Sequence, residues 1–364
     1  MAEEPISENL TGSRKRPHSP SEHCIENSQD GKEKRNIDER TSKDYYFDSY
    51  AHHAIHEEML KDEIRTRTYQ SAILDNPHIF RDKIVLDVGC GTAVLAMFAV
   101  QAGAKHCYAI DCSSIIDQAK LIVQKNGFSE SITLIKGKVE EIELPVDSVD
   151  IVVSEWMGYF LLYESMLDTV IFARDKWLIK DGIIFPDKAI MYISALEDAA
   201  VKRDRIDFWN DVYGFDMTPI KQIALCEPVV DVVDAKAIVT DAVPIVELDI
   251  LTCRKEDASF ASDFVLCAQR NDFINGFCAH FECAFTQIHK PIGFSTSPFS
   301  NYTHWKQTIL YLEDAITICE GEKIYGRICC RPNRKNRRDL DITLDIKFKG
   351  SRCQMDEEVK FRLR

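Results

Sequence analysis

The 364-residue sequence contains no apolar run as long as the ~18 residues that a membrane-spanning helix needs. Its first residues, Met-Ala-Glu-Glu-Pro, contain no apolar segment either, so we expect no secretory signal. The 13 cysteines are odd in number and include no C-x-x-C pair, which argues against a disulfide framework and against a zinc site. We therefore expect a protein of the cytoplasm and nucleus with reduced thiols, no metal and no membrane partner.

Positive charge is also in short supply. Lys and Arg number 45 against 59 Asp and Glu, which gives a formal net charge of −14. Such a balance disfavours direct binding to the phosphate backbone of nucleic acids and suits a protein that attracts basic partners. Apolar residues, by contrast, make up 45% of a chain long enough for two domains with cores of their own.

Composition and periodicity divide the chain into four parts. Residues 1–42 are rich in charged residues and Ser and poor in aromatics, which predicts a disordered tail. Residues 43–75 place apolar side chains at helical intervals, which predicts helices covering an edge of the next domain. Residues 76–187 alternate strand and helix patterns, which predicts a Rossmann-like parallel sheet. Residues 188–364 read as many short strands, which predicts an antiparallel barrel or sandwich.

Some elements are defined by clear patterns of their own. A helix is predicted over Ile115–Lys125 and a strand over Ile132–Lys136 in the first domain. In the second domain, strands are predicted at Val246–Thr252 and Asp341–Lys349, and a helical insert with exposed aromatic residues around Ala199–Tyr213. Such an aromatic helix is a candidate contact for another subunit.

A glycine turn, Gly89-Cys90-Gly91, lies between a predicted strand and a predicted helix. Asp111 ends the next strand, twenty positions after Gly91, where an acidic residue can accept hydrogen bonds from ribose hydroxyls. Val94 stands where a dinucleotide site needs its third glycine. Asp87, just before the turn, would repel a pyrophosphate but suits an ammonium group. These features favour S-adenosylmethionine.

Two glutamates lie in one otherwise apolar loop. Glu155 follows the apolar run Val149–Val153, which predicts a buried strand, and so leaves the strand end where parallel sheets keep their ligand crevice. Glu164 comes nine residues later. Two carboxylates in such a loop repel each other unless a cation lies between them, and a guanidinium, charged at every physiological pH, is suitable. From these residues alone, a pair of solvated loop glutamates is the alternative.

Four motifs taken together resemble those of the type I protein arginine methyltransferases. They are Tyr46-Phe47-Asp48-Ser49-Tyr50, Val85-Leu86-Asp87-Val88-Gly89-Cys90-Gly91-Thr92, the glutamate loop and Tyr302-Thr303-His304-Trp305. The resemblance runs from about Ser42 to the C-terminus and is strongest to the predominant enzyme of that type. It implies a Rossmann-like domain that binds S-adenosylmethionine, then a β-barrel domain whose helical arm, about residues 197–222, forms a homodimer.

The resemblance implies methyl transfer to arginine guanidinium nitrogens of proteins, giving mono- and asymmetric dimethylarginine. Gly-Arg-rich segments and histone tails would be the substrates. Glu155 and Glu164 would hold the guanidinium, and His304 would pair with Asp62 beside them. Methionine at position 59 goes with asymmetric rather than symmetric dimethylation in this family.

The resemblance also implies a set of cofactor-binding residues. Arg65 would pair the methionine carboxylate of S-adenosylmethionine, and Glu140 would lie near its adenine. Helices of residues 43–75 would cover the bound molecule. The full set is Tyr46, Phe47, His56, Met59, Arg65, Asp87, Gly89, Gly91, Asp111, Glu140 and Met166.

Three positions depart from the family pattern. Ala93 replaces a glycine, Asp111 replaces a glutamate, and His53-Ala54 replaces an aromatic residue and a glycine. All three concern cofactor binding, so a catalytically weak or silent relative that acts as a dimerisation partner or scaffold is an alternative. A nicotinamide-dependent oxidoreductase is a more remote one, against which Val94 and the lack of a hydride-transfer dyad argue.

Overall fold

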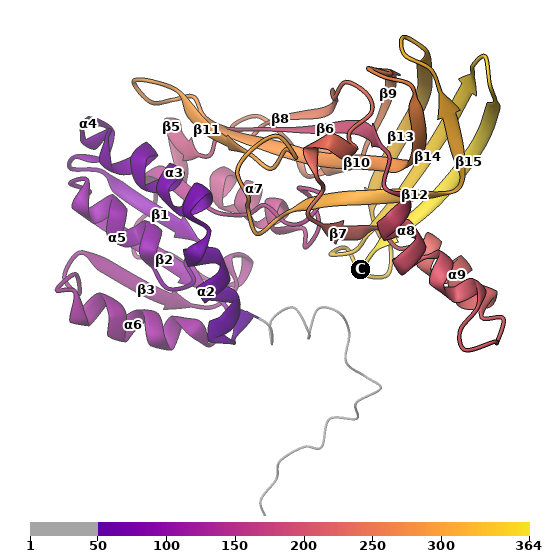
Figure 1. The fold of residues 1–364 in the computed structure, drawn as a ribbon. Helices are drawn as coiled ribbons and strands as arrows, with labels where there is room; N and C mark the ends of the chain where they lie inside the picture. The colour runs from indigo at the N-terminus through magenta and orange to yellow at the C-terminus, as the bar shows by residue number, and fades with distance from the viewer. Residues whose placement is uncertain (1–49) are drawn as a thin grey trace, which may run out of the picture. The chain divides into compact units, whose positions relative to one another are not determined.

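The computed structural model describes residues 50–364. The predicted disordered tail and two of the predicted cofactor residues, Tyr46 and Phe47, lie outside the described residues. Within them, the order of the elements is a parallel α/β domain followed by antiparallel sheets (Figure 1).

The first domain contains a five-stranded parallel sheet in the order β3-β2-β1-β4-β5. Long runs of buried aliphatic side chains explain why these segments form interior strands of a parallel sheet. The predicted alternation of strand and helix is confirmed. The strands are β1 (Ile84–Val88), β2 (His106–Asp111), β3 (Ile132–Lys136), β4 (Val149–Ser154) and β5 (Leu178–Phe185), and the helices are α4 (Pro77–Phe80), α5 (Val94–Gln101), α6 (Ile115–Lys125) and α7 (Met166–Trp177).

The two loops that carry the sequence motifs leave neighbouring strands. β1 and β4 pair in the middle of the sheet, with Val88 opposite Ser154. The hydroxyl of Ser154 donates a hydrogen bond to the carbonyl of Val88 at 2.7 Å, which ties the two strand ends together. The glycine turn follows β1 and Glu155 follows β4, so both emerge at the same carboxyl edge of the sheet.

The second domain contains two antiparallel sheets. One has the order β7-β12-β10-β6-β8, with β11 paired to β10, and the other the order β15-β14-β13-β9. β8 lies beside β9 and β12 beside β15, and Phe264 meets Phe277 across the core, so the sheets pack as a barrel. The strands are β6 (Lys188–Leu196), β7 (Val229–Asp231), β8 (Val243–Asp249), β9 (Phe260–Cys267), β10 (Asp272–Phe285), β11 (Ile292–Ser295), β12 (Gln307–Ile318), β13 (Lys323–Pro332), β14 (Leu340–Lys349) and β15 (Gln354–Leu363).

Two N-terminal helices, α2 (His53–Lys61) and α3 (Glu63–Leu74), lie across the carboxyl edge of the parallel sheet. Tyr69 of α3 is fully buried and donates a hydrogen bond from its hydroxyl to the carbonyl of Ser154 at 2.9 Å. Its ring meets Phe285 of β10 edge to face, with the ring centres 5.0 Å apart. One side chain therefore joins α3 to the end of β4 and to the barrel domain.

A helical arm leaves the barrel domain between β6 and β7 and extends beyond the sheets in Figure 1. It consists of α8 (Ala199–Arg205), a short 3-10 turn (Asp207–Asn210) and α9 (Thr218–Leu225), and so is broken into three pieces where the sequence suggested one insert. Several of its large apolar side chains are exposed, with Tyr213 97% and Phe215 67% accessible, whereas Ile206 and Leu225 are buried.

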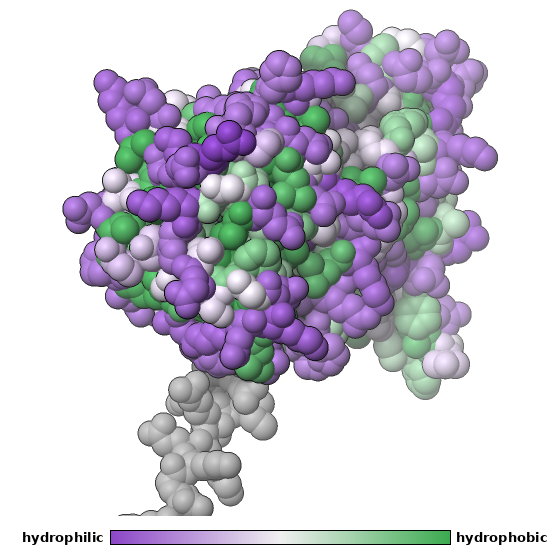
Figure 2. Space-filling model, turned by 90° about the vertical axis from the view of Figure 1, so that its left-hand side faces the viewer, coloured by the Kyte–Doolittle hydropathy of each residue, from purple (hydrophilic) through white to green (hydrophobic). Residues whose placement is uncertain are grey.

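The surface of the first domain is mixed in character. Figure 2 shows hydrophilic side chains over most of this face, with hydrophobic ones scattered among them. Leu60, Leu121 and Ile179 are the large apolar side chains of this domain that are exposed among the described residues. No helix within residues 50–364 has the length and apolar character to span a bilayer.

Candidate functional site

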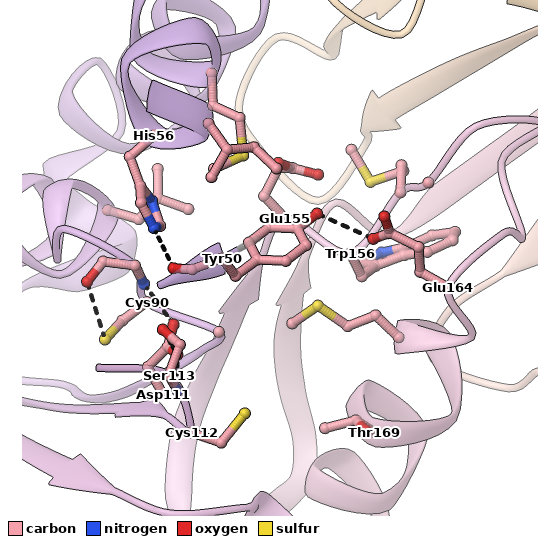
Figure 3. Close-up of a pocket in the computed structure, with 18 of the residues that line it drawn as sticks. Tyr50, His56, Cys90, Asp111, Cys112, Ser113, Glu155, Trp156, Glu164 and Thr169 are labelled. Carbon is pink, nitrogen blue, oxygen red and sulfur yellow. Dashed lines mark hydrogen bonds between the residues drawn. The ribbon is translucent and has the colours of Figure 1, made fainter. Parts of the chain in front are cut away.

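A cavity of about 420 Å³ opens at the carboxyl edge of the parallel sheet, between α2 and the loops that follow β1, β2 and β4 (Figure 3). Most of the residues singled out from the sequence line this one cavity. They are His56, Met59, Arg65, Gly89, Gly91, Asp111, Glu140, Glu155, Glu164, Met166 and His304. Asp62 and Asp87 do not line it.

The glycine turn allows other groups to approach its backbone closely. Gly89 has a φ of +74°, and a Cβ there would lie 2.2 Å from Cε of Met166. Gly91 has a φ of +51°, and a Cβ would lie 3.2 Å from the ring of His56. The backbone N–H of Gly91 donates to Oδ2 of Asp111 at 2.9 Å, so the acidic residue that ends β2 also holds the turn in place.

Ala93 adopts a backbone conformation that favours glycine. Its φ is +65° and its ψ +25°, immediately before α5, and its side chain is fully buried. The departure from the family pattern therefore falls at a position where a Cβ introduces backbone strain.

Asp87 supports the turn from behind the cavity. Its side chain is completely buried, and Oδ2 accepts a hydrogen bond from the backbone N–H of Ala96 in α5 at 3.1 Å. Oδ1 has no hydrogen-bond partner within residues 50–364, and burial raises the pKa of this carboxyl group to about 7. The structure thus places Asp87 against the first turn of α5, where it supports the glycine turn and does not itself line the cavity.

The loop that carries the two glutamates has an unusual backbone. Phe160, Leu161, Glu164 and Ser165 all have positive φ values, of +50°, +59°, +77° and +55°. Gly158 has no room for a side chain, since a Cβ would lie 2.1 Å from the carbonyl oxygen of Tyr163. Non-glycine residues in this conformation are strained and persist only where the surroundings hold them, a pattern that concentrates at functional sites.

Glu155 already contacts a guanidinium group. Nε of Arg65 donates to its Oε2 at 2.9 Å, and both side chains are 8% exposed. Nη1 of the same arginine donates to the carbonyl of Met59 at 3.2 Å. Arg65 was expected to pair with the carboxylate of the cofactor. In this structure it lines the cavity and its ion pair is with Glu155.

Glu164 is bound differently. The hydroxyl of Tyr50 donates to its Oε2 at 2.9 Å, as Figure 3 shows. Burial, opposed by this hydrogen bond and reinforced by the charge of Glu155, raises the pKa of Glu164 to about 7. The two carboxylates are therefore not equivalent: one is paired with a cation and the other is poised to gain or lose a proton near neutral pH.

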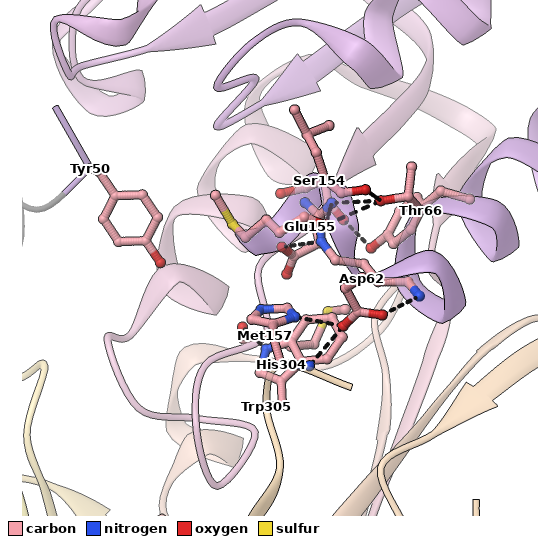
Figure 4. A network of polar contacts seen from close by, with 12 residues as sticks. Tyr50, Asp62, Thr66, Ser154, Glu155, Met157, His304 and Trp305 are labelled. Carbon is pink, nitrogen blue, oxygen red and sulfur yellow. Dashed lines mark hydrogen bonds and ion pairs between the residues drawn. The ribbon is translucent and has the colours of Figure 1, made fainter. Parts of the chain in front are cut away.

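The predicted contact between His304 and Asp62 is present (Figure 4). Nδ1 of His304 lies 2.7 Å from Oδ2 of Asp62, and the backbone N–H of His304 donates to the same oxygen at 2.8 Å. Oδ1 accepts from the N–H of Arg65 and so caps α3. Burial would raise the pKa of Asp62, but the hydrogen bonds from His304 and Arg65 outweigh it and hold the pKa below its usual value.

Glu140 and two methionines also line the cavity. Glu140 accepts a hydrogen bond from the hydroxyl of Thr169 at 2.8 Å, beside the loop after β3. Met59 and Met166 both line the cavity, and Trp305 donates from Nε1 to the carbonyl of Met157 at 2.8 Å, which fixes the start of the glutamate loop.

Sequence reasoning missed the specific roles of Tyr50 and Arg338. Tyr50 lies within a quoted motif, but nothing in the motif indicated that its hydroxyl contacts Glu164. Arg338 lies between β13 and β14, far along the chain, yet it lines the cavity and bonds to the backbone of Glu164. The available signal was the basic run Arg334-Lys335-Asn336-Arg337-Arg338 in an acidic chain.

Family models match both domains. Residues 85–174 match a methyltransferase domain, and residues 187–351 match the arginine methyltransferase oligomerization subdomain. Protein arginine N-methyltransferase 1 of Chlamydomonas reinhardtii is 54% identical over 326 residues, which cover 90% of this chain and 94% of that protein. Its namesake in Oryza sativa subsp. indica is 56% identical over 326 residues, covering 90% of this chain and 84% of that protein.

A solved structure gives the same result. A chain of the Trypanosoma brucei PRMT1 enzyme-prozyme heterotetrameric complex with AdoHcy has a TM-score of 0.85 and 46% identity, and the match covers 87% of this chain and all of that one. These matches span both domains, and they agree with the fold and with the motifs gathered around the cavity. The chain belongs to the protein arginine N-methyltransferase family.

Proposed function

We propose that this protein transfers methyl groups from S-adenosylmethionine to guanidinium nitrogens of arginine residues in other proteins. The observation that supports this best is that Glu155 and Glu164 line the same cavity as the glycine turn. A cation held by the two carboxylates would thus face a methyl donor held by the turn. Nothing in the site favours the scaffold alternative, because both glutamates are present and converge on one cavity.

The residues of the cavity fit S-adenosylmethionine. Two glycines with positive φ leave the turn open to a ligand, and Asp111 and Glu140 supply carboxylates on the side where a nucleoside would lie. Arg65, His56, Met59 and Met166 would surround the amino-acid end. When bound, this molecule supplies an electrophilic methyl group on a positively charged sulfur.

The two glutamates would bind and orient the substrate. Charge-assisted hydrogen bonds from the guanidinium N–H groups to Glu155 and Glu164 draw positive charge toward the held nitrogens. The third nitrogen then keeps more lone-pair density and can be aimed at the methyl carbon. Such orientation can lower a barrier by ~7–11 kcal/mol in favourable cases. The new bond joins nitrogen to the methyl carbon, and the electrons of the broken carbon–sulfur bond stay with sulfur.

A proton must leave the methylated nitrogen, and His304 is placed to accept it. Its Nδ1 is occupied by Asp62, so Nε2 is the ring nitrogen left for proton transfer. The Asp62 carboxylate fixes the orientation of the ring and stabilises the charged imidazole. His304 lines the cavity, whereas Asp62 acts through it.

We propose further that the products are mono- and asymmetric dimethylarginine, because Met59 and Met166 line the cavity as the resemblance implies. Substrates would be Gly-Arg-rich segments and histone tails, which the net charge of −14 would attract. The exposed apolar arm supports a homodimer. The basic clusters Arg14-Lys15-Arg16-Pro17 and Lys34-Arg35, outside the described residues, support a nuclear as well as a cytoplasmic location.

The test is transfer of a radiolabelled methyl group from S-adenosylmethionine to an Arg-Gly-rich peptide, followed by identification of the methylated amino acids. We expect monomethylarginine first and asymmetric dimethylarginine later. Glu164→Gln should abolish transfer while leaving the affinity for S-adenosylhomocysteine unchanged, because Glu164 does not belong to the turn. A folded, oligomeric wild-type protein that binds S-adenosylhomocysteine but methylates no arginine would instead support the scaffold alternative.

A further inference from the structure

The loop between β13 and β14, residues 333–339, belongs to the barrel domain but reaches the glutamate loop of the first domain. Nη1 of Arg338 donates to the backbone carbonyl of Glu164 at 2.6 Å, and the N–H of Glu164 donates back to the carbonyl of Arg338 at 2.9 Å. The hydroxyl of Ser165 donates to the carbonyl of Arg337. The two loops are thus joined by hydrogen bonds at consecutive residues, Glu164 and Ser165.

These are the same two residues that have positive φ values of +77° and +55°. Neither is a glycine, so their conformation depends on external support. The backbone N–H and C=O of Glu164 both bond to Arg338. The partner that fixes the strained backbone of Glu164 is therefore the barrel-domain loop, in addition to the glutamate loop itself.

The β13–β14 loop is itself rigidly built, by two asparagines. The buried side chain of Asn333 accepts from the N–H of Lys335 at 2.9 Å and of Asn336 at 3.2 Å. Its amide donates to Asp341 at 2.9 Å, and the amide of Asn336 donates to Asp339 at 2.6 Å. A loop organised in this way can hold Arg338 in one position.

Arg338 also brings charge to the site, since it lines the cavity. The ionisable groups around the Glu164 carboxyl are Tyr50, Glu155, Tyr159, Tyr163 and Arg338. Of these, Glu155 raises the pKa of Glu164 by its negative charge, and Arg338 lowers it by its positive charge. Arg338 is the cation of this group, and it favours the ionised form that a guanidinium needs.

We propose that Arg338 is a positioning residue of the active site, which fixes the backbone of Glu164 and adds a positive charge to the cavity where the substrate guanidinium would bind. The inference rests on the proposed function. It assigns to the barrel domain a part in substrate binding, besides oligomerization. It also assigns a role to one residue of the basic run at 334–338, because Arg338 lines the cavity while Arg334 is exposed.

The experiment compares Arg338→Gln, Arg338→Lys and Arg334→Ala by the pH dependence of kcat/KM for an Arg-Gly-rich peptide. Arg334 is a matched control, because it lies in the same loop and its side chain makes no hydrogen bond or ion pair within residues 50–364. Arg338→Gln keeps a hydrogen-bond donor but loses the charge. In this variant we expect the rise of kcat/KM on the acidic side of the pH profile to occur about one pH unit higher than in the wild type. Arg338→Lys keeps the positive charge, so its pH profile should match the wild type. Its kcat should fall by up to about 100-fold, because a lysine cannot hold the backbone of Glu164 in the same position. Arg334→Ala should match the wild type.

A second measurement is independent of catalysis. The titration of the Glu164 carboxyl group can be followed by ¹³C NMR of protein labelled at glutamate, with the signal identified by its loss in Glu164→Gln. Arg338→Gln should raise the pKa of Glu164, and Arg334→Ala should not. An unchanged titration in Arg338→Gln would overturn the inference even if the wild type is active. A wild type without methyl transfer would refute the proposed function, while the titration would still decide the role of Arg338.

Discussion

The hydrogen bond from Tyr50 to Glu164 allows a quantitative prediction. Substituting Tyr50→Phe removes only the hydroxyl that donates to Oε2 at 2.9 Å. A hydrogen bond to a charged group contributes about 1.5–3 kcal/mol, and 1.36 kcal/mol corresponds to one pKa unit. Taking the lower figure, the pKa of Glu164 should rise from about 7 to about 8 in the variant. The ionised fraction at pH 7 would fall from about one half to about one tenth.

The consequence for catalysis depends on pH. If only the ionised form of Glu164 binds the guanidinium, kcat/KM of Tyr50→Phe should be about fivefold below wild type at pH 7 and nearly equal to it at pH 9. The substrate arginine stays charged throughout this range, so it adds no limb of its own. The assay is initial-rate methyl transfer to an Arg-Gly-rich peptide at saturating S-adenosylmethionine, between pH 6 and pH 9.5. A deficit that is the same at pH 7 and at pH 9 would refute the reasoning, because it would show that Tyr50 acts by something other than the ionisation of Glu164.

Three further predictions test other parts of the site. Glu164→Gln should stabilise the protein above pH 7 by at most about 3 kcal/mol. The pKa of Glu164 is about 7 in the folded protein against 4.5 in the unfolded chain, so the wild type loses stability as the pH rises from 4.5 to 7. The difference in Tm between variant and wild type should therefore vanish below about pH 4.5. Asp62→Asn should lower the free energy of unfolding by about 1–2 kcal/mol and reduce methyl transfer. The two carboxylate oxygens of Asp62 accept from Arg65 and from His304, whereas an amide has only one oxygen that can accept. An unchanged Tm and rate would contradict this prediction. Gly158→Ala should abolish methyl transfer but not S-adenosylhomocysteine binding, because its Cβ would lie 2.1 Å from the carbonyl of Tyr163. The matched control is Gly127→Ala, where φ is +77° and an added Cβ would meet no atom of another part of residues 50–364 within 4 Å; it should cost about 1 kcal/mol of stability and leave the rate unchanged.

Much of the first domain was predictable because its signals are local. The helix predicted over Ile115–Lys125 and the strand predicted over Ile132–Lys136 are α6 and β3 with the same bounds. Both are defined by apolar periodicity between polar flanks, which neighbouring residues determine. The barrel was harder. β8 covers Val243–Asp249, three residues before the predicted Val246–Thr252, because alternation in short antiparallel strands leaves the register to the partner strands.

The site shows the same division. The residues that line the cavity could be selected from motifs, because the motifs lie at the ends of predicted parallel strands, and such ends share one edge. Their partners could not. Arg65 and Glu155 are 90 residues apart, and Arg338 and Glu164 are 174 apart. These contacts depend on how α3 and the β13–β14 loop pack against the glutamate loop, and no local pattern carries that information. Asp87 is a further example, since the motif indicated a role at the ligand but not the hydrogen bond that its Oδ2 accepts from Ala96 of α5.

The unequal treatment of the two glutamates has a physical reason. For two buried carboxylates with no cation between them, burial disfavours the ionised form of each, and the two negative charges repel each other. A site with both groups ionised and no bound cation is therefore unfavourable. In this chain Arg65 compensates the charge of Glu155. The carboxylate of Glu164 makes no ion pair within residues 50–364, and burial shifts it toward the protonated form. At Glu164 an arriving guanidinium then replaces a proton, whereas at Glu155 it joins a carboxylate that is already paired with Arg65. The positive charge of the entering arginine replaces the positive charge of the proton that leaves Glu164. The site can therefore bind a cation tightly and is also stable before the cation binds.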